Sequence, residues 1–179
     1  MSPSLEQLKY PIGHYLPPDP IPESLIKTWI SEIQSLPAAL ESALAGMTDT
    51  QLDTPYRPGG WTVRQLVHHL ADSHVNAHCR LRLALTEDGP TIKPYEQDEW
   101  AELADVKNMP VVHSLNILTG LHARWAFLLK NLSSSQFQRV FVHPEYQKTY
   151  SIGEMTGLYA WHGKHHLAHI TELKKRNGW

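Results

Sequence analysis

Apolar residues recur at helical spacing along four stretches of the chain. These stretches cover about residues 23–45, 63–86, 110–131 and 151–176. Because a period of 3.6 residues places such positions on one face of a helix, each stretch predicts a long amphipathic helix. No stretch of the chain gives a strong strand signal. The pattern therefore predicts an all-α protein, folded as a four-helix bundle.

Three local signals bear on the ends and continuity of these helices. Thr62 with Gln65, and Ser151 with Glu154, have the spacing of a capping box. In such a box each side chain bonds a backbone N–H that the helix start leaves free, so the second and fourth helices should begin just after Thr62 and Ser151. Pro37 lies inside the first stretch and predicts a kink or a break there, because proline has no N–H to donate.

The segments between the helices are predicted to be connections. Residues 1–22 hold six prolines and should be extended and lie over the surface. Residues 87–109 form a long connection with a short helical turn near 98–103, and VFVHPEY (140–146) predicts a short extended excursion. The whole chain, residues 1–179, is expected to fold as one domain with an extended N-terminal segment.

Composition narrows the classes of function. The chain is 41% hydrophobic and 19% charged, as in a globular protein, and its net charge of -2 lacks the basic excess of a nucleic-acid binder. It has no run of 18 apolar residues and no apolar N-terminal signal, so neither membrane insertion nor secretion is expected. Cys79 is the single cysteine, which excludes an intrachain disulfide and fits a reducing, cytoplasmic setting.

Histidine is the residue type that stands out, with 12 copies. The string YAWHGKHHLAHITEL (159–173) holds two pairs at spacing i, i+4, namely His162 with His166 and His165 with His169. Because a helix turns about 100° per residue, all four side chains fit one arc, and either pair could bind a metal ion. The apolar residues around them centre nearer His162 and His166, which modestly favours that pair as the inward one.

A third ligand could come from the helix predicted over residues 63–86. His69 borders the apolar face of this helix and His74 lies within it, whereas His68 is expected to meet solvent and His78 lies on the far flank. Two histidines one turn apart and a third from a facing helix make a three-histidine site with one open position, as in catalytic zinc sites. The alternative is a histidine-rich solvated face, or buried histidines bonded to carbonyl groups.

Several other kinds of site are excluded by their motifs. Gly163 follows His162, so the metalloprotease pattern H-E-x-x-H is absent, and no Glu has a His three positions later, as di-iron bundles require. The chain has no P-loop and no G-x-G-x-x-G. Cys79 has no cysteine partner and lies off the predicted core face, which argues against a thiolate ligand.

Two strings together resemble a known family. GGWTVRQLVHHLADSH (59–74) and WHGKHHLAHITEL (161–173) are similar to the DinB superfamily, and within it to the YfiT-like branch. YPIGHY near the start, TPYRPGGW, LHARW (121–125) and the terminal GW also look like that branch. The resemblance covers nearly the whole chain, residues 10–179.

The resemblance implies a four-helix bundle that holds zinc or nickel with three histidines, one divalent ion per chain. By motif match the ligands are His69, which precedes Leu-Ala, and the pair His162 and His166, with Ile170 in the aliphatic position that follows. This implies that His74, His165 and His169 do not bind the ion directly. Homodimers are also typical of the branch.

Three functions follow as expectations. The first is a metal-dependent hydrolase that activates water against a small-molecule substrate. The second is an S-transferase that uses the same ion to activate a low-molecular-weight thiol of the bacillithiol type. The third is a metal-binding module without catalysis. Residue types alone do not decide between water and thiol, because zinc accepts both as ligands.

Further residues near the expected ligands in sequence are weaker candidates, and each has a plain structural alternative. Asp72, three residues after His69, could orient an imidazole or handle a proton; a solvated helix carboxylate is the alternative, and Glu172 is similar. His74 could hydrogen-bond a ligand or be an ordinary core histidine. Trp61 and Trp161 could line a pocket, and a place in the core is their alternative. Tyr56 and Arg57 could face an anionic substrate, and an ordinary loop is their alternative.

Overall fold

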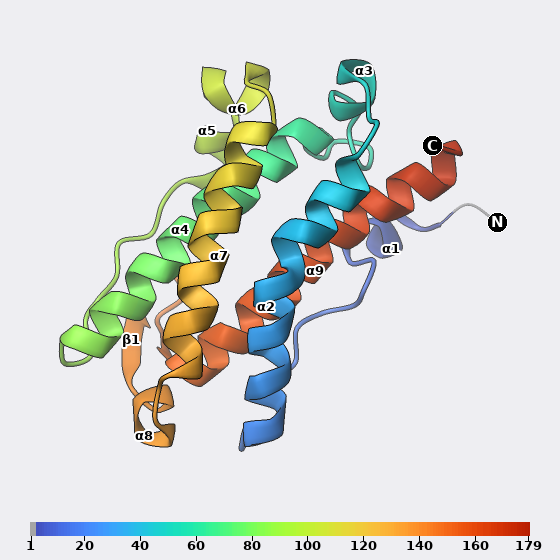
Figure 1. The fold of residues 1–179 in the computed structure, drawn as a ribbon. Helices are drawn as coiled ribbons and strands as arrows, with labels where there is room; N and C mark the ends of the chain where they lie inside the picture. The colour runs from blue at the N-terminus through green and yellow to red at the C-terminus, as the bar shows by residue number, and fades with distance from the viewer. Residues whose placement is uncertain (1–2) are drawn as a thin grey trace.

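The computed structural model describes residues 3–179, and four long helices form its body (Figure 1). They are α2 (Glu23–Leu44), α4 (Val63–Thr86), α7 (Val112–Lys130) and α9 (Ile152–Asn177). Each end lies within two residues of its predicted position. The predicted all-α four-helix bundle is therefore confirmed.

The predicted capping boxes form at the starts of α4 and α9. The Thr62 side chain accepts from the backbone N–H of Gln65, whose side chain accepts in return from the N–H of Thr62. Ser151 and Glu154 make the same reciprocal pair. At its other end α9 stops at Gly178, whose φ of 68° is a left-handed conformation that favours glycine.

The first two long helices, α2 and α4, are not neighbours in this bundle. α2 packs against α7 and α9, and α4 packs against the same two helices, so α2 and α4 lie on a diagonal. The two helices richest in histidine, α4 and α9, are thereby direct neighbours. Along both helices the buried histidines separate two apolar clusters, one around Trp125 and the other around Leu66 and Leu70.

Short elements complete the fold. They are α1 (Leu5–Lys9), α3 (Asp49–Leu52), α5 (Gln97–Ala101), α6 (Ala104–Asn108), α8 (Ser134–Phe137) and the strands β1 (Val140–His143) and β2 (Lys148–Ser151). The strands pair antiparallel, with Val140 opposite Ser151, so the predicted extended excursion is half of a small hairpin. Within residues 3–179, no helix is both long and apolar enough to cross a membrane.

The prediction that residues 1–22 are wholly extended was wrong at α1. Ser4 and Gln7 form a capping box, which stabilises one helical turn in spite of the nearby prolines. Residues 1–2 lie outside the described part of the chain. After α1 the segment follows α9: the Tyr15 hydroxyl donates to the Glu154 carbonyl (3.1 Å), and Trp161 Nε1 donates to the Gly13 carbonyl (3.2 Å).

Pro37 does not break its helix. α2 continues through it, and the proline side chain is buried in the bundle. The missing N–H of Pro37 leaves the carbonyl of Ile33, four residues earlier, without its usual partner in the helix. His122 Nδ1 from α7 hydrogen-bonds this carbonyl instead. A neighbouring helix thus uses the acceptor that the proline leaves free.

His68 and His78 are both buried, so the expectation that His68 meets solvent was wrong. His68 Nδ1 lies 2.7 Å from Ser114 Oγ, and its Nε2 lies 3.1 Å from the Met109 carbonyl. The connection after α4 folds back over this side of the helix as α5 and α6 and covers it. His78 packs edge-on against Trp125 of α7. Helical periodicity could not show that a connecting segment would cover the outer face.

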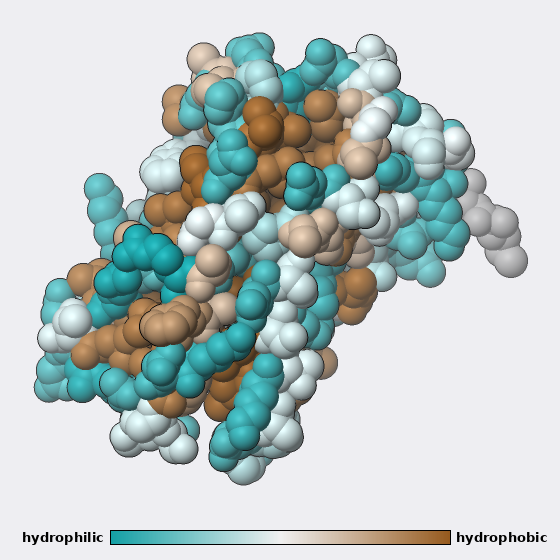
Figure 2. Space-filling model, in the orientation of Figure 1, coloured by the Kyte–Doolittle hydropathy of each residue, from teal (hydrophilic) through white to brown (hydrophobic). Residues whose placement is uncertain are grey.

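Exposed apolar side chains occur along α7. Phe127 is 72% exposed, and Val112 and Ile117 are each 49% exposed. Figure 2 shows hydrophobic surface over α7 and the elements beside it, interrupted by hydrophilic residues. Apolar surface of this kind is common at contacts between subunits.

Candidate metal centre

Three histidine nitrogens converge between α4 and α9. Nε2 of His162 lies 3.4 Å from Nε2 of His69 and 3.1 Å from Nε2 of His166. The three residues offer ligand atoms that all lie within 4.8 Å of one another. His69 and His166 are buried, whereas His162 is partly exposed. The structure thus brings together the three histidines that the motif match named.

Burial keeps these rings neutral. Loss of hydration lowers the pKa of His69 to about 4, and it holds the pKa of both His162 and His166 well below the usual range. Mutual repulsion among the neighbouring imidazolium forms adds to the effect for His162 and His166. At neutral pH each ring therefore carries a single N–H, and its other nitrogen has a free lone pair.

A chain of hydrogen bonds determines which nitrogen of His162 carries the proton. Burial also lowers the pKa of His122 and His74, so both are neutral. A carbonyl only accepts, so His122 must donate from Nδ1 to Ile33, and its Nε2 must accept from His74 Nδ1 (2.8 Å). His74 Nε2 then accepts from His162 Nδ1 (3.1 Å). This leaves Nε2 of His162 without a hydrogen.

A second, shorter chain does the same for His166. His169 Nε2 donates to the Lys9 carbonyl (3.0 Å), and burial lowers the pKa of His169 to about 4. His169 Nδ1 is therefore an acceptor, and His166 Nδ1 lies 3.3 Å away as its donor. Nε2 of His166 is thus also without a hydrogen. This contact with Lys9 comes from α1, the helix that the sequence did not predict.

The 3.1 Å contact between His162 and His166 is therefore not a hydrogen bond. Each Nε2 atom carries a lone pair and no hydrogen, so neither atom can donate a hydrogen bond to the other. Two lone pairs at this distance repel each other unless a cation lies among them. The donor set is thus suited to a divalent ion that accepts imidazole ligands.

A second group of three histidines has suitable spacing. His165, His166 and His169 also offer atoms within 4.8 Å of one another. In this group His169 Nε2 already donates to Lys9 and its Nδ1 faces His166, so its nitrogens are engaged. His165 stacks on Trp161 with ring centres 4.4 Å apart. These features favour His165 as part of the rim and His169 as the partner that orients His166.

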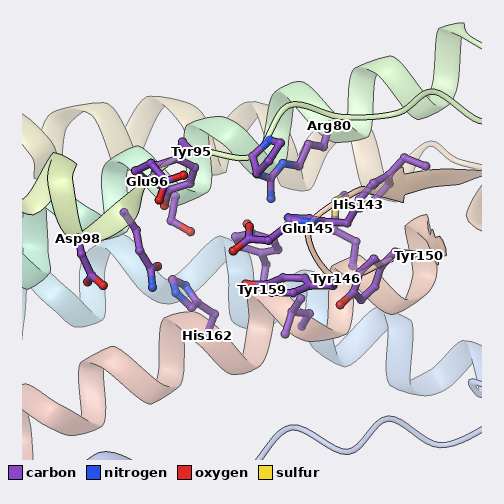
Figure 3. Close-up of a pocket in the computed structure, with 16 residues that line it drawn as sticks. Arg80, Tyr95, Glu96, Asp98, His143, Glu145, Tyr146, Tyr150, Tyr159 and His162 are labelled. Carbon is purple, nitrogen blue, oxygen red and sulfur yellow. The ribbon is translucent and has the colours of Figure 1, made fainter. Parts of the chain in front are cut away.

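Two adjoining cavities border the converging histidines. The mouth is lined by residues from the N-terminal segment, the loop before α4, and α9; it includes Trp61, Arg57, Trp161 and His165. An inner pocket of about 400 Å³ runs from His162 toward Arg80 and His143 (Figure 3). The two cavities share Gln97, Asp98, Tyr146 and His162. A molecule in the inner pocket would therefore lie against His162.

The other predicted residues fall in three places. Trp61 packs on His69 with ring centres 4.6 Å apart, and Tyr56 stacks on His169 at 4.0 Å. Glu172 is exposed beside His169, outside both cavities. Asp72 is half-buried and does not belong to the described residues that line either cavity. Burial and the nearby Asp105 raise the pKa of Asp72 to about 6.

Sequence reasoning missed three residues that the structure brings to this region. His122 falls on the apolar stripe of α7 between Leu118 and Trp125, and a histidine at such a buried position was the available signal. Arg80 and His143 line the far end of the inner pocket, although they are 63 residues apart in the chain. No spacing rule connects a helix residue with a hairpin residue, so no sequence signal pairs these two.

Comparison with known proteins adds the family. The model of the DinB superfamily matches residues 32–170, which span most of the bundle and all three converging histidines. The chain belongs to the DinB superfamily. The resemblance of its histidine-bearing strings to that superfamily is thereby confirmed.

Relatives within the DinB superfamily are similar over nearly their whole length. A protein of Oceanobacillus iheyensis is 53% identical over 171 residues, which cover 96% of this chain and 98% of the relative. YfiT of Bacillus subtilis is 50% identical over 172 residues, covering 96% and 97%. Both are named as metal-dependent hydrolases whose activity is proposed.

A solved structure has the same fold. YfiT from Bacillus subtilis superposes with a TM-score of 0.95 at 50% identity, covering 97% of this chain and 99% of that one. It is described as a probable metal-dependent hydrolase with an unusual four-helix bundle topology. In this chain the diagonal placement of α2 and α4 is the feature that departs from a simple up-and-down bundle.

Proposed function

We propose that this protein is a metal-dependent hydrolase that acts on a small-molecule substrate. His69, His162 and His166 would hold one divalent ion per chain, zinc or nickel. The observation that carries the proposal is the 3.1 Å contact between two Nε2 atoms that the hydrogen-bond chains leave without hydrogens. The names of the relatives that share half of its residues support the same activity.

The residues around the site divide the remaining tasks. When bound, the ion would supply Lewis acidity and lower the pKa of a coordinated water toward about 7. His74 and His169 orient two of the imidazoles and hold their Nδ1 hydrogens. The partial exposure of His162 and the two adjoining cavities give a substrate access to this point.

The test is metal content together with the reaction that it supports. We expect purified protein to carry about one zinc or nickel ion per chain by elemental analysis, and a chelator to remove both the ion and esterase or amidase activity. Conjugation of a thiol to an electrophile, measured on the same samples, tests the S-transferase alternative. Protein that carries the ion but accelerates neither reaction would support a non-catalytic metal-binding module instead.

The thiol alternative rests on the charge of the site. Three neutral imidazoles leave a divalent ion with its full positive charge, which also favours a bound thiolate. Adding a thiol to the hydrolysis assay distinguishes the two functions. A thiol that is a substrate should be consumed, whereas a thiol that only binds the ion should inhibit hydrolysis. The inner pocket adjoining His162 favours a catalytic role over a closed storage site.

Asp72 stays our candidate for proton handling, and its substitution separates that role from a structural one. The raised pKa, about 6, means that the folded state holds the proton more tightly than the unfolded chain. Ionisation of Asp72 therefore lowers the stability of the folded state. This loss of stability grows as the pH rises from about 4 to 6, and it is complete above that range. We expect Asp72→Asn to raise the melting temperature at pH 7.5, and to have little effect at pH 4.

Activity of the same variant decides the catalytic question. A loss of activity at pH 7.5, with metal content unchanged, would support proton handling by Asp72. Unchanged activity together with the gain in stability would leave it as a buried carboxylate that repels Asp105. The control is Asp88→Asn, because Asp88 is exposed after α4 and lines neither cavity, so its substitution should change neither activity nor stability.

We also propose that the protein is a cytoplasmic homodimer. Exposed Phe127 and Ile117 on α7 give a surface that a second copy could cover, and the single cysteine fits a reducing compartment. Light scattering should give twice the chain mass of 20.4 kDa, and Phe127→Glu should shift it toward the monomer. A monomeric wild type at all accessible concentrations would exclude this assembly.

A further inference from the structure

The inner pocket ends at an arginine, Arg80. Arg80 on α4 is half-buried, and its buried Nε has no hydrogen-bond partner within residues 3–179. In the same part of the chain, no carboxylate lies within 4.0 Å of its guanidinium. Arg64, by contrast, is buried and bonded to both Asp49 and Asp53. Buried cations are normally paired in this way, so the isolation of Arg80 requires an explanation.

His143 lies at the same end of the pocket and also lacks a partner. It is 6% exposed, and its buried Nδ1 makes no hydrogen bond to the described residues. Burial lowers the pKa of His143, and the positive charge of Arg80 lowers it further, so the two groups are close enough to interact. Its ring stacks on Tyr146 with centres 4.4 Å apart, which holds its orientation. Two side chains that each carry an unsatisfied nitrogen therefore line the same end of the pocket.

The carboxylates of the pocket do not neutralise Arg80. Glu96, Asp98 and Glu145 line the pocket but are exposed. Figure 3 shows Asp98 and Glu96 toward His162, and Arg80 with His143 toward the opposite end. Glu145 lies nearer His143, and its negative charge raises the pKa of that residue. It makes no ion pair with Arg80 within residues 3–179, so the far end of the pocket keeps a cation that a ligand can pair with.

We propose that the far end of this pocket binds an oxyanion of the substrate, a carboxylate or a phosphate group, through Arg80 and His143. The planar guanidinium presents N–H donors in a fork that matches two oxygens of such a group. The apolar body of the substrate lies along Tyr95, Tyr150 and Tyr159, and its reactive group faces His162. This assignment rests on the proposed hydrolase function for its orientation, but the oxyanion site itself does not require a bound ion.

The test compares two probes of nearly equal shape, benzoate and benzamide, which differ in charge. Calorimetric or NMR titration of the wild-type protein should show tighter binding of benzoate, by about tenfold or more, since a hydrogen bond to a charged group is among the stronger polar contacts. Phenyl phosphate extends the comparison and distinguishes a carboxylate from a phosphate preference. Equal affinities for benzoate and benzamide would overturn the proposal.

Variants locate the binding. Arg80→Gln should remove the preference for benzoate, whereas Arg80→Lys should keep part of it, because lysine retains the charge without the fork. His143→Phe keeps the stacking on Tyr146 and should weaken benzoate binding by a smaller factor. The matched control is Arg82→Gln, which removes an exposed arginine two residues further along α4. Benzoate affinity that survives Arg80→Gln, in a variant with wild-type helix content, would contradict the assignment.

One more comparison separates this proposal from the metal proposal. The titrations are repeated on chelator-treated protein and on His69→Gln. Benzoate binding that persists in both and still depends on Arg80 supports an oxyanion site, whether or not the histidines bind an ion. Binding that disappears with the ion and ignores Arg80→Gln would place the anion at the histidines and overturn the proposal. Absence of metal from the wild type would instead count against the proposed function alone.

Discussion

Replacing His162 by glutamine is expected to weaken metal binding by more than about a hundredfold, since loss of mere orienting partners already costs 10–100-fold in metal sites. Nε2 of His162 lies 3.4 Å from Nε2 of His69 and 3.1 Å from Nε2 of His166, so its loss removes one of the three converging nitrogens. Hydrolytic activity should fall with the metal. Competition with a chromophoric chelator measures the affinity directly, without a known substrate.

The controls for this variant test which histidine cluster holds the ion. His165→Gln removes a member of the second group of three but not of the first, and should leave the affinity nearly unchanged. His113→Gln removes an exposed histidine on α7 and controls for nonspecific binding. If His165→Gln abolished binding while His162→Gln did not, the ion would belong to the second cluster and the ligand assignment would be wrong.

Replacing His74 by phenylalanine is expected to weaken metal binding by about 10–100-fold although His74 does not bind the ion. His74 accepts from His162 Nδ1 at 3.1 Å and thereby keeps the hydrogen off Nε2. Without this acceptor His162 loses the bond that selects its metal-binding tautomer, and a buried N–H is left unsatisfied. Chelator competition measures the affinity, and nitrogen chemical shifts of the histidine rings report the tautomer.

A conservative variant separates orientation from packing. Glutamine at position 74 offers a carbonyl to accept from His162 and an amide to donate to His122, as the neutral imidazole does. His74→Gln should therefore retain more affinity than His74→Phe, while His122→Phe, one bond further from the site, should cost less than His74→Phe. Equal affinities of wild type and His74→Phe, or an Nε2–H tautomer of His162 in the metal-free protein, would contradict the hydrogen-bond chain.

Much of the fold could be predicted because its determinants are local. The capping boxes at Thr62 and Ser151 set the starts of α4 and α9, and the 3.6-residue period identified which side of each helix is apolar. The same period put His162 and His166 on one side, one turn apart. The capping box of Ser4 is equally local, but the six prolines of residues 1–22 favour an extended segment and so mask its signal.

The rest depended on which elements are neighbours. Periodicity expected His68 to meet solvent, but α5 and α6 fold over that side of α4. It also left Arg80 and His143 unconnected, because they meet only when the hairpin packs beside α4. Pairings between distant elements arise from the packing of whole faces, which a one-dimensional pattern does not encode.

By itself, then, the sequence determined the four helices, their ends and the set of histidines from which a metal site could be built. The tertiary structure decided how those histidines are paired with acceptors. Pro37 shows the difference: the sequence indicated only a missing N–H, whereas packing of α7 on α2 directs His122 to the carbonyl that this proline leaves free. Tautomers depend on partners from other helices, so the metal-binding form of His162 is a property of the fold and not of its own helix.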